Sequence, residues 1–255
     1  GNITISGADA TLTATGTDGA DPATPSTIIL PNNTLTITNG GLFQLLDGAL
    51  LNMNVGNTTK IEVGGDTAET AGKFYVKDSS VTGTDNGGGT ATGKHFNGTG
   101  YGQFVFDNAT VNPTSRYSIS LSDHSSFVLK GATDWQSASR IVSINMTGDS
   151  AFTISEGSSF THFMWTEGSP FSLSDSAKFT VTGTDSKLLL NNGGNMNAIS
   201  LAGNSTMEIA DGGTATGART ALTLSEGASL DIRDGGSFSS TAASANNGAP
   251  KLMLK

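Results

Sequence analysis

The sequence predicts an all-β protein wound as a right-handed parallel β-helix, a solenoid of about 8 to 10 coils with three short strands per coil. Three observations predict this fold. Apolar-x-apolar triplets recur about every 25 residues, phenylalanines lead one column of these triplets, and small or turn-forming residues follow them at fixed distances. No helix pattern of useful length appears, so we expect a single β-helix domain over residues 1–255.

The first strand of each coil is an alternating triplet, which is typical of a strand with one buried face. In the second half of the chain, five residues separate each such triplet from a second one. Strands this short, with so few residues between them, favour a coil that pairs each strand with its equivalent in the next coil. The first-strand pairs are Ile119 and Leu121, Ile144 and Met146, Phe171 and Leu173, Ile199 and Leu201, and Leu222 and Leu224.

The second strand forms a column that extends into the N-terminal half. Six of the 12 phenylalanines lead it, which predicts a ladder of offset stacked rings inside the coil. Its pairs are Phe43 and Leu45, Phe74 and Val76, Phe104 and Phe106, Phe127 and Leu129, Phe152 and Ile154, Phe179 and Val181, Met207 and Ile209, and Leu230 and Ile232. A third strand follows six residues later and aligns Trp135, Phe160, Ala215 and Phe238. We therefore expect Trp135 to stack in the core and not to bind a ligand.

The turns between strands repeat as well. A small residue stands four positions after the first strand, which predicts a corner without room for a side chain: Gly41, Ser125, Ser150, Ala177, Ser205 and Ala228. Two positions after the second strand stand residues that favour bends through side-chain hydrogen bonds or positive φ: Asp47, Asp78, Asn108, Gly131, Glu156, Gly183, Asp211 and Asp234. Residues 14–27 and 82–103 lack the pattern, so we expect them to be protruding loops.

The composition narrows the function classes. Charged residues make up only 14% of the chain, and disordered chains usually carry more charge and fewer aromatics. The net charge of −9, without basic clusters, argues against nucleic acid and anionic membranes as partners. The absence of cysteine excludes disulfides and thiolate metal sites. No apolar run of about 18 residues and no basic-plus-apolar leader occur, so we expect the chain to start after any export signal or never to have had one.

The repeated cores resemble the passenger regions of bacterial autotransporters, the surface proteins of type V secretion. The string from Leu222 to Phe238, LTLSEGASLDIRDGGSF, and the string from Phe171 to Val181, FSLSDSAKFTV, are similar to the coils of self-associating and cell-binding adhesins. The resemblance covers residues 29–240. The resemblance implies that the protein is secreted to the cell surface and has a role in virulence. It implies a function in autoaggregation or in attachment to host glycans or proteins. It also implies membrane attachment only through an outer-membrane translocator domain, which is absent here. A two-partner-secreted protein or another surface β-helix also fits.

Three residues outside the regular columns are candidate ligand contacts. His95 and Tyr101 fall in the predicted loop 82–103, and Trp165 lies outside the strand register, where it caps a coil edge or joins Tyr101 in an exposed patch. No histidine pair has metal-ligand spacing. We expect no cofactor and no metal.

The sequence supports a catalytic site less well than a binding site. Asp211 and Asp234 occupy equivalent turns of adjacent coils, about one strand spacing apart, which is close to the carboxylate separation of retaining glycosidases. Their Asp-Gly-Gly context favours a turn role, so we predict that the chain is not an enzyme and keep a polysaccharide-degrading or polysaccharide-binding β-helix as the alternative. His124 beside Asp123 and Ser125 is interpreted as a solvated turn and not as a triad. Two further alternatives are a weak calcium site at the stacked Asp turns and an ice-binding array formed by the threonines of 11–15 and 34–38.

Overall fold

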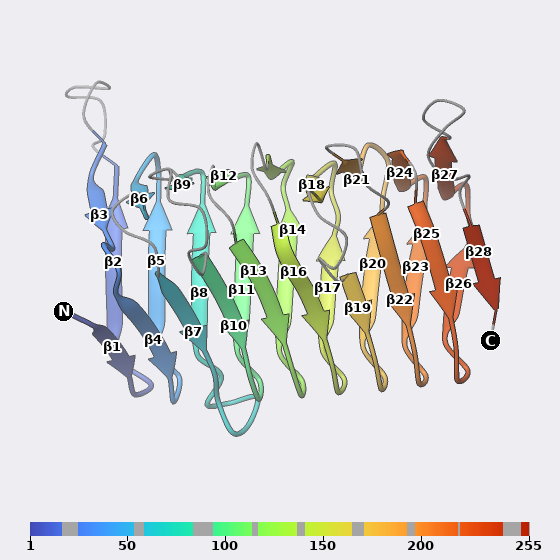
Figure 1. Cartoon of the computed structure of the whole chain (residues 1–255). Coiled ribbons are helices and arrows are strands. Elements are labelled where there is room, and N and C mark those ends of the chain that lie inside the picture. Colours follow the sequence, from blue (N-terminus) through green and yellow to red (C-terminus); the bar gives the residue numbers. More distant parts are fainter. Residues whose placement is uncertain are drawn as a thin grey trace.

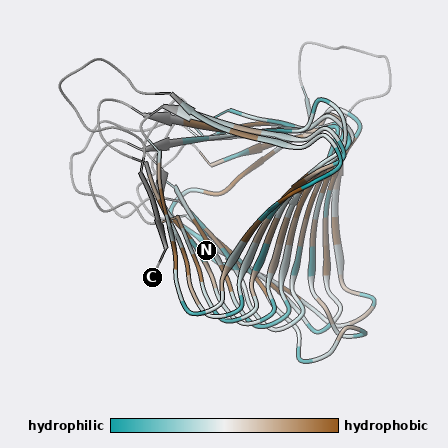
Figure 2. Cartoon of the chain, turned by 90° about the vertical axis from the view of Figure 1, so that its right-hand side faces the viewer, coloured by the Kyte–Doolittle hydropathy of each residue, from teal (hydrophilic) through white to brown (hydrophobic). Residues whose placement is uncertain are grey.

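The structure is a computed structural model in which three parallel sheets wind around one core (Figure 1). It describes residues 1–16, 25–53, 59–83, 94–113, 117–136, 141–164, 171–192, 197–218, 220–241 and 251–254. None of these residues is helical, and every described strand pair is parallel. Seen from the C-terminal end, the chain advances toward the reader anticlockwise around a roughly triangular section (Figure 2), so the coil is right-handed. The predicted fold class is confirmed.

Each coil contributes one strand to each sheet. The first sheet contains, in order, β1 (Ile3–Ser6), β4 (Thr34–Thr38), β7 (Lys60–Val63), β10 (Lys94–Gly98), β13 (Tyr117–Leu121), β16 (Ile141–Met146), β19 (Phe171–Leu173), β22 (Asn197–Leu201), β25 (Thr220–Leu224) and β28 (Lys251–Leu254). The second sheet contains β2 (Thr11–Thr15), β5 (Leu42–Leu46), β8 (Lys73–Lys77), β11 (Gln103–Asp107), β14 (Ser126–Lys130), β17 (Ala151–Ile154), β20 (Lys178–Thr182), β23 (Thr206–Ala210) and β26 (Ser229–Ile232). The third sheet contains β3 (Thr27–Ile29), β6 (Leu50–Asn52), β9 (Ser80–Gly83), β12 (Thr110–Pro113), β15 (Asp134–Trp135), β18 (Ser159–Met164), β21 (Lys187–Asn192), β24 (Thr214–Ala218) and β27 (Ser237–Thr241).

The predicted columns are in register. The second-strand column runs without a slip from Phe43 to Leu230, and Leu12 extends it by one coil. The third-strand column joins Trp135, Phe160, Ala215 and Phe238 through Leu188. Alternation of buried and outward residues along most strands places these columns inside the coil, although Ile232 in the last coil of the second-strand column is 45% exposed.

The phenylalanine ladder is less regular than the sequence predicts. Phe43 and Phe74 stack with their rings 2° from parallel and their centroids 5.0 Å apart. The pair Phe127 and Phe152 is tilted by 44° at 4.7 Å. Rings from the other two sheets account for the tilt, because Trp135 meets Phe127 edge-on at 5.4 Å. Trp135 itself is fully buried, which confirms its predicted core role.

Both predicted turn patterns are confirmed. The corner residues Ser125, Ser150, Ala177 and Ser205 are fully buried. At Gly41 a Cβ atom would lie 2.4 Å from the carbonyl oxygen of Ile5. The eight positions after the second strand all have positive φ, between 48° and 89°: Asp47, Asp78, Asn108, Gly131, Glu156, Gly183, Asp211 and Asp234. Asp, Asn and Gly tolerate this conformation best, which explains the composition of the turn.

The predicted loop over 82–103 is too wide. Lys94–Gly98 forms β10, which pairs with β7 and β13 and buries Phe96. The alternation is hidden because Gly98 takes the place of the second apolar residue, and a Cβ there would lie 3.0 Å from side-chain atoms of Leu121 and Ser125. The other predicted loop, over 14–27, is also too wide, because its ends belong to β2 and β3. Residues 84–93 and 17–24 lie outside the described residues.

Candidate ligand-binding corner

The candidate site lies at the corner between the first and second sheets, where β10 and β13 end. The turn after β10 runs over residues 99–102, and the turn after β13 runs over residues 122–125. Backbone hydrogen bonds stack these turns: the amide of Tyr101 donates to the carbonyl of Gly65 at 2.9 Å, and the amide of His124 donates to the carbonyl of Gly100 at 2.9 Å. Residues at the same turn position therefore lie above one another.

Two rings occupy one position of these stacked turns. The rings of Tyr101 and His124 lie 25° from parallel with their centroids 4.6 Å apart. Nδ1 of His124 lies 3.5 Å from a carboxylate oxygen of Asp149 on the next coil, and the His124 side chain remains 47% exposed. The pair borders a hollow of about 560 Å³, the corner hollow. The corner hollow is lined by residues that include Gly65, Asp66, Thr99, Tyr101, Asp123 and His124.

Asp123 stabilises the turn conformation at this corner. Its Oδ2 accepts a hydrogen bond from the backbone amide of Gly100 at 3.2 Å and another from the hydroxyl of Ser122 at 3.0 Å. Gly100 has a φ of 56°, and a Cβ there would lie 2.1 Å from the carbonyl oxygen of Gly65. The corner therefore needs both the glycine and the carboxylate that caps it, and the rings rest on a fixed backbone.

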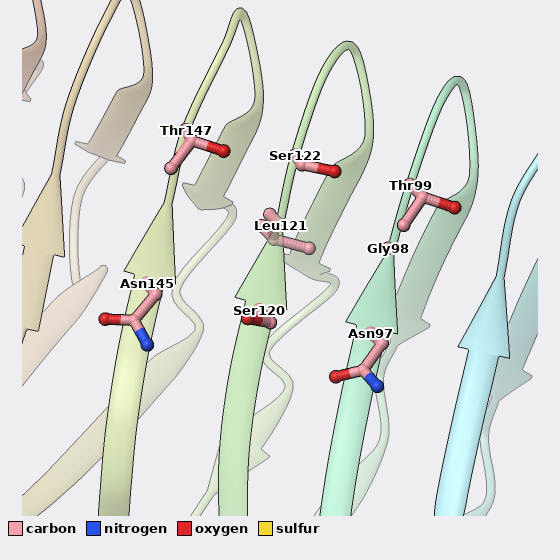
Figure 3. Close-up of a pocket in the computed structure, with 8 residues that line it drawn as sticks. All are labelled: Asn97, Gly98, Thr99, Ser120, Leu121, Ser122, Asn145 and Thr147. Atoms are coloured by element: carbon pink, nitrogen blue, oxygen red, sulfur yellow. The ribbon is translucent and has the colours of Figure 1, made fainter.

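A second hollow of about 290 Å³ adjoins the first on the outer face of the first sheet. Figure 3 shows Asn97, Ser120 and Asn145 in one row across β10, β13 and β16, where the strand register aligns them. A second row, formed by Thr99, Ser122 and Thr147, stands where these strands end. Together the two rows line the hollow above Gly98 and Leu121. None of these residues carries a charge. We call this the strand hollow; Thr99 lines both hollows.

His95 lies on the same face, two residues before Asn97. Its Nδ1 is 2.5 Å from the hydroxyl of Ser118, its neighbour in register on β13. Partial burial, and after it the charge of Lys60, lowers the pKa of His95 below its ordinary value, so the ring is mainly neutral at pH 7. The structure thus places His95 and Tyr101 at opposite ends of the segment that carries Asn97 and Thr99. Trp165, the third predicted contact, lies outside the described residues.

The sequence predicts His124 only as a solvated turn residue. The turn is exposed, but the ring stacks on Tyr101, a contact that the sequence interpretation missed. Both residues stand three positions after the last inward residue of their strands, Gly98 and Leu121. The shared position becomes visible only when β10 is recognised as a strand.

The predicted carboxylate pair has turn partners. Asp211 and Asp234 occupy equivalent positions, and the amide of Gly212 donates to the carbonyl of Asp234 at 3.1 Å. The carboxylate of Asp211 accepts from the hydroxyl of Thr182 at 2.8 Å, while that of Asp234 binds Arg233 at 2.6 Å. Each carboxylate is therefore bound by a neighbouring side chain at its turn.

Other predicted alternatives can be placed on the structure. Ser125, beside His124, is fully buried, and its Oγ accepts from the amide of Ser122 at 3.1 Å. The threonines of 11–15 lie on the second sheet and those of 34–38 on the first, so they do not form one array. Over the described ranges, no group of three or more His, Asp or Glu residues is arranged to hold a metal ion. No helix long and apolar enough to cross a membrane occurs among these residues.

Comparisons with protein-family models, with curated proteins and with solved structures give no match for this chain. The fold is therefore established from the structure alone.

Proposed function

We propose that this chain is a non-catalytic binding shaft of a secreted bacterial surface protein, an adhesin, and that it attaches to glycans at the corner hollow. The observation that carries the proposal is the stacked pair of Tyr101 and His124 beside a hollow of about 560 Å³. The resemblance of the repeated cores to autotransporter passengers supports the surface location, with membrane attachment left to segments outside this chain.

Physical chemistry supports a sugar at this place. Aromatic faces carry negative potential and attract the weakly positive C–H groups of a pyranose face. The volume falls in the range of small-ligand sites, which combine an apolar platform with a few placed polar groups. The backbone that carries the rings is fixed by Gly100 and Asp123, so little ordering entropy is lost when a ligand binds.

The test is a glycan-binding screen with the variant Tyr101→Ala and its matched control Tyr75→Ala. Tyr75 also lies on the outside of the shaft, on β8 of the second sheet, where its hydroxyl donates to Asp107 at 3.4 Å. We expect wild type and Tyr75→Ala to bind the same glycans, and Tyr101→Ala to lose at least about tenfold in affinity, or 1.4 kcal/mol. The proposal fails if no glycan binds or if both variants behave alike.

Self-association between copies is a second candidate function. It is favoured by the uncharged row that continues the strand hollow along the first sheet through Ser172, Ser200 and Thr223. Many weak hydrogen bonds between such rows become effective when many copies face each other on two cells. Sedimentation velocity over a range of concentrations tests this function, because a strictly monomeric shaft together with non-aggregating cells would exclude it.

A further inference from the structure

We infer that the ligand of the corner is an uncharged oligosaccharide, with one sugar against Tyr101 and His124 and the next sugar in the strand hollow between the amides of Asn97 and Asn145. This inference rests on the proposed glycan binding and adds the ligand class and the residues that select it.

The shape of the strand hollow comes from one short side chain between two longer ones. Asn97, Ser120 and Asn145 are neighbours in register on three successive coils. With strands about 4.8 Å apart, the two asparagines stand roughly 10 Å apart, on either side of the recessed Ser120. Figure 3 shows their amide groups extending on both sides of that gap. The gap is of the size of a single pyranose ring.

The polar groups of this gap are available to a ligand. In the part of the chain that the structure describes, neither the amide of Asn97 nor the hydroxyl of Ser120 has a hydrogen-bond partner. The Oδ1 of Asn145 accepts from the hydroxyl of Ser172 at 2.8 Å, and its Nδ2 remains as a donor. Donors and an acceptor therefore face one another across the gap, which is the arrangement that neighbouring hydroxyls or an N-acetyl group of a sugar can satisfy.

The charges select against acidic sugars. The described residues that line the strand hollow are all uncharged, and those that line the corner hollow include the carboxylates of Asp66 and Asp123 but no lysine or arginine. An anionic sugar would be repelled by these carboxylates, which costs binding free energy. We therefore expect neutral glycans to bind and sialylated or uronic-acid glycans to be rejected.

The two hollows form one path. Thr99 lines both, since it stands between the outward Asn97 on the strand and Tyr101 on the turn. A ligand of two or more sugars can therefore turn the corner from the rings to the amides. A single sugar reaches only one of the two places.

The substitution that tests this inference is Ser120→Asn, with Ser200→Asn as its matched control. Asparagine already occupies the same row on both neighbouring coils, so Ser120→Asn fills the gap without a foreign residue type. Ser200 lies in the same row, three coils further along on β22. Affinity is measured by titration calorimetry with neutral oligosaccharides and with the same oligosaccharides carrying a uronic acid, and thermal unfolding checks the fold.

We expect Ser120→Asn to weaken oligosaccharide binding at least tenfold, and Ser200→Asn to bind like wild type. If Ser120→Asn does not fold, Asn97→Ala provides the second test and is expected to weaken binding as well. Equal binding by the Ser120→Asn and Ser200→Asn variants, or preferred binding of the acidic ligands, overturns the inference. If Tyr101→Ala abolishes binding while Ser120→Asn and Asn97→Ala leave it intact, the glycan site stands and only the inference fails. If no glycan binds to wild type, the proposed function itself fails.

Discussion

Burial of His162 in its neutral form is expected to make the shaft less stable in mild acid than at neutral pH. His162 lies on the inner side of β18 and is completely buried. It is in register with Leu190 on β21, and its ring centroid is 5.5 Å from that of Phe171. Among the residues that the structure describes, neither ring nitrogen of His162 has a hydrogen-bond partner. Burial therefore lowers the pKa of His162 from its ordinary 6.5 to about 3.

The size of the effect follows from the two pKa values. The unfolded chain takes up a proton below pH 6.5 while the folded chain does not do so until about pH 3, so the free energy of unfolding falls as the pH is lowered through this window. Each pH unit below 6.5 costs about 1.4 kcal/mol of stability. At pH 5 the loss from this one residue is about 2 kcal/mol relative to neutral pH.

The assay compares urea unfolding of wild type and His162→Leu at pH 7.5 and at pH 5. Leucine matches the neighbour Leu190 and cannot be protonated, so we expect the stability difference between the two proteins to change by about 2 kcal/mol in favour of His162→Leu at pH 5. Contributions from other titrating groups cancel in this difference. Phe160→Leu on the same strand is the control, and its difference from wild type is expected to be independent of pH. A pH-independent difference for His162→Leu would refute the reasoning.

Three further predictions concern turns and charges. Gly100→Ala is expected to lower the unfolding free energy by about 2 kcal/mol, because positive φ is combined with a clash. Gly157→Ala is the control: its φ is 75°, but the nearest atom is 4.0 Å away, so it is expected to cost less stability in the same denaturant titration. Glu208→Gln is expected to destabilise the chain at pH 7 by about 1–3 kcal/mol, since its carboxylate binds Lys178 and Arg233. Hydrogen bonding, first of all by Lys178, lowers the pKa of Glu208, so the destabilisation is present above the ordinary carboxylate pKa and vanishes as the pH falls through the folded value. Wild type is expected to release no reducing ends from a polysaccharide panel; release that is lost in Asp234→Asn would instead support the hydrolase alternative.

The columns of the core could be predicted because the turn between the first two strands has a constant length. Five residues separate Leu121 from Phe127, and the same number separates Leu201 from Met207, so the phase of the alternation carries over from coil to coil. Positive φ at Asp47 and Asp211 could be predicted for a related reason, since one backbone conformation must recur wherever the turn recurs.

The tilt of the rings and the strand β10 could not be predicted from that pattern. Ring angles depend on side chains of the other two sheets, such as Trp135, whose position across the core is set only by the closed coil. β10 lacks its second apolar residue, because Leu121 and Ser125 of the next coil leave no room for a side chain at Gly98. The candidate site depends on β10, so only Tyr101 and His95 could be found from residue type, and their neighbours His124 and Asn97 could not.

A solenoid repeats its backbone, so a specific site must come from side chains that depart from the repeat. At the turn position of Tyr101 and His124, the following coils carry Asp149, Ser176 and Asn204, and none of these is a ring. On the first sheet, the short Ser120 separates two asparagines and opens the hollow. Both departures fall on the same coils and share Thr99, whereas the strands that carry Asn97, Ser120 and Asn145 stay paired in register at these residues. Substitutions at Tyr101 and Ser120 can therefore change binding while the shaft that carries them stays the same, which makes the proposed site separable from the fold by experiment.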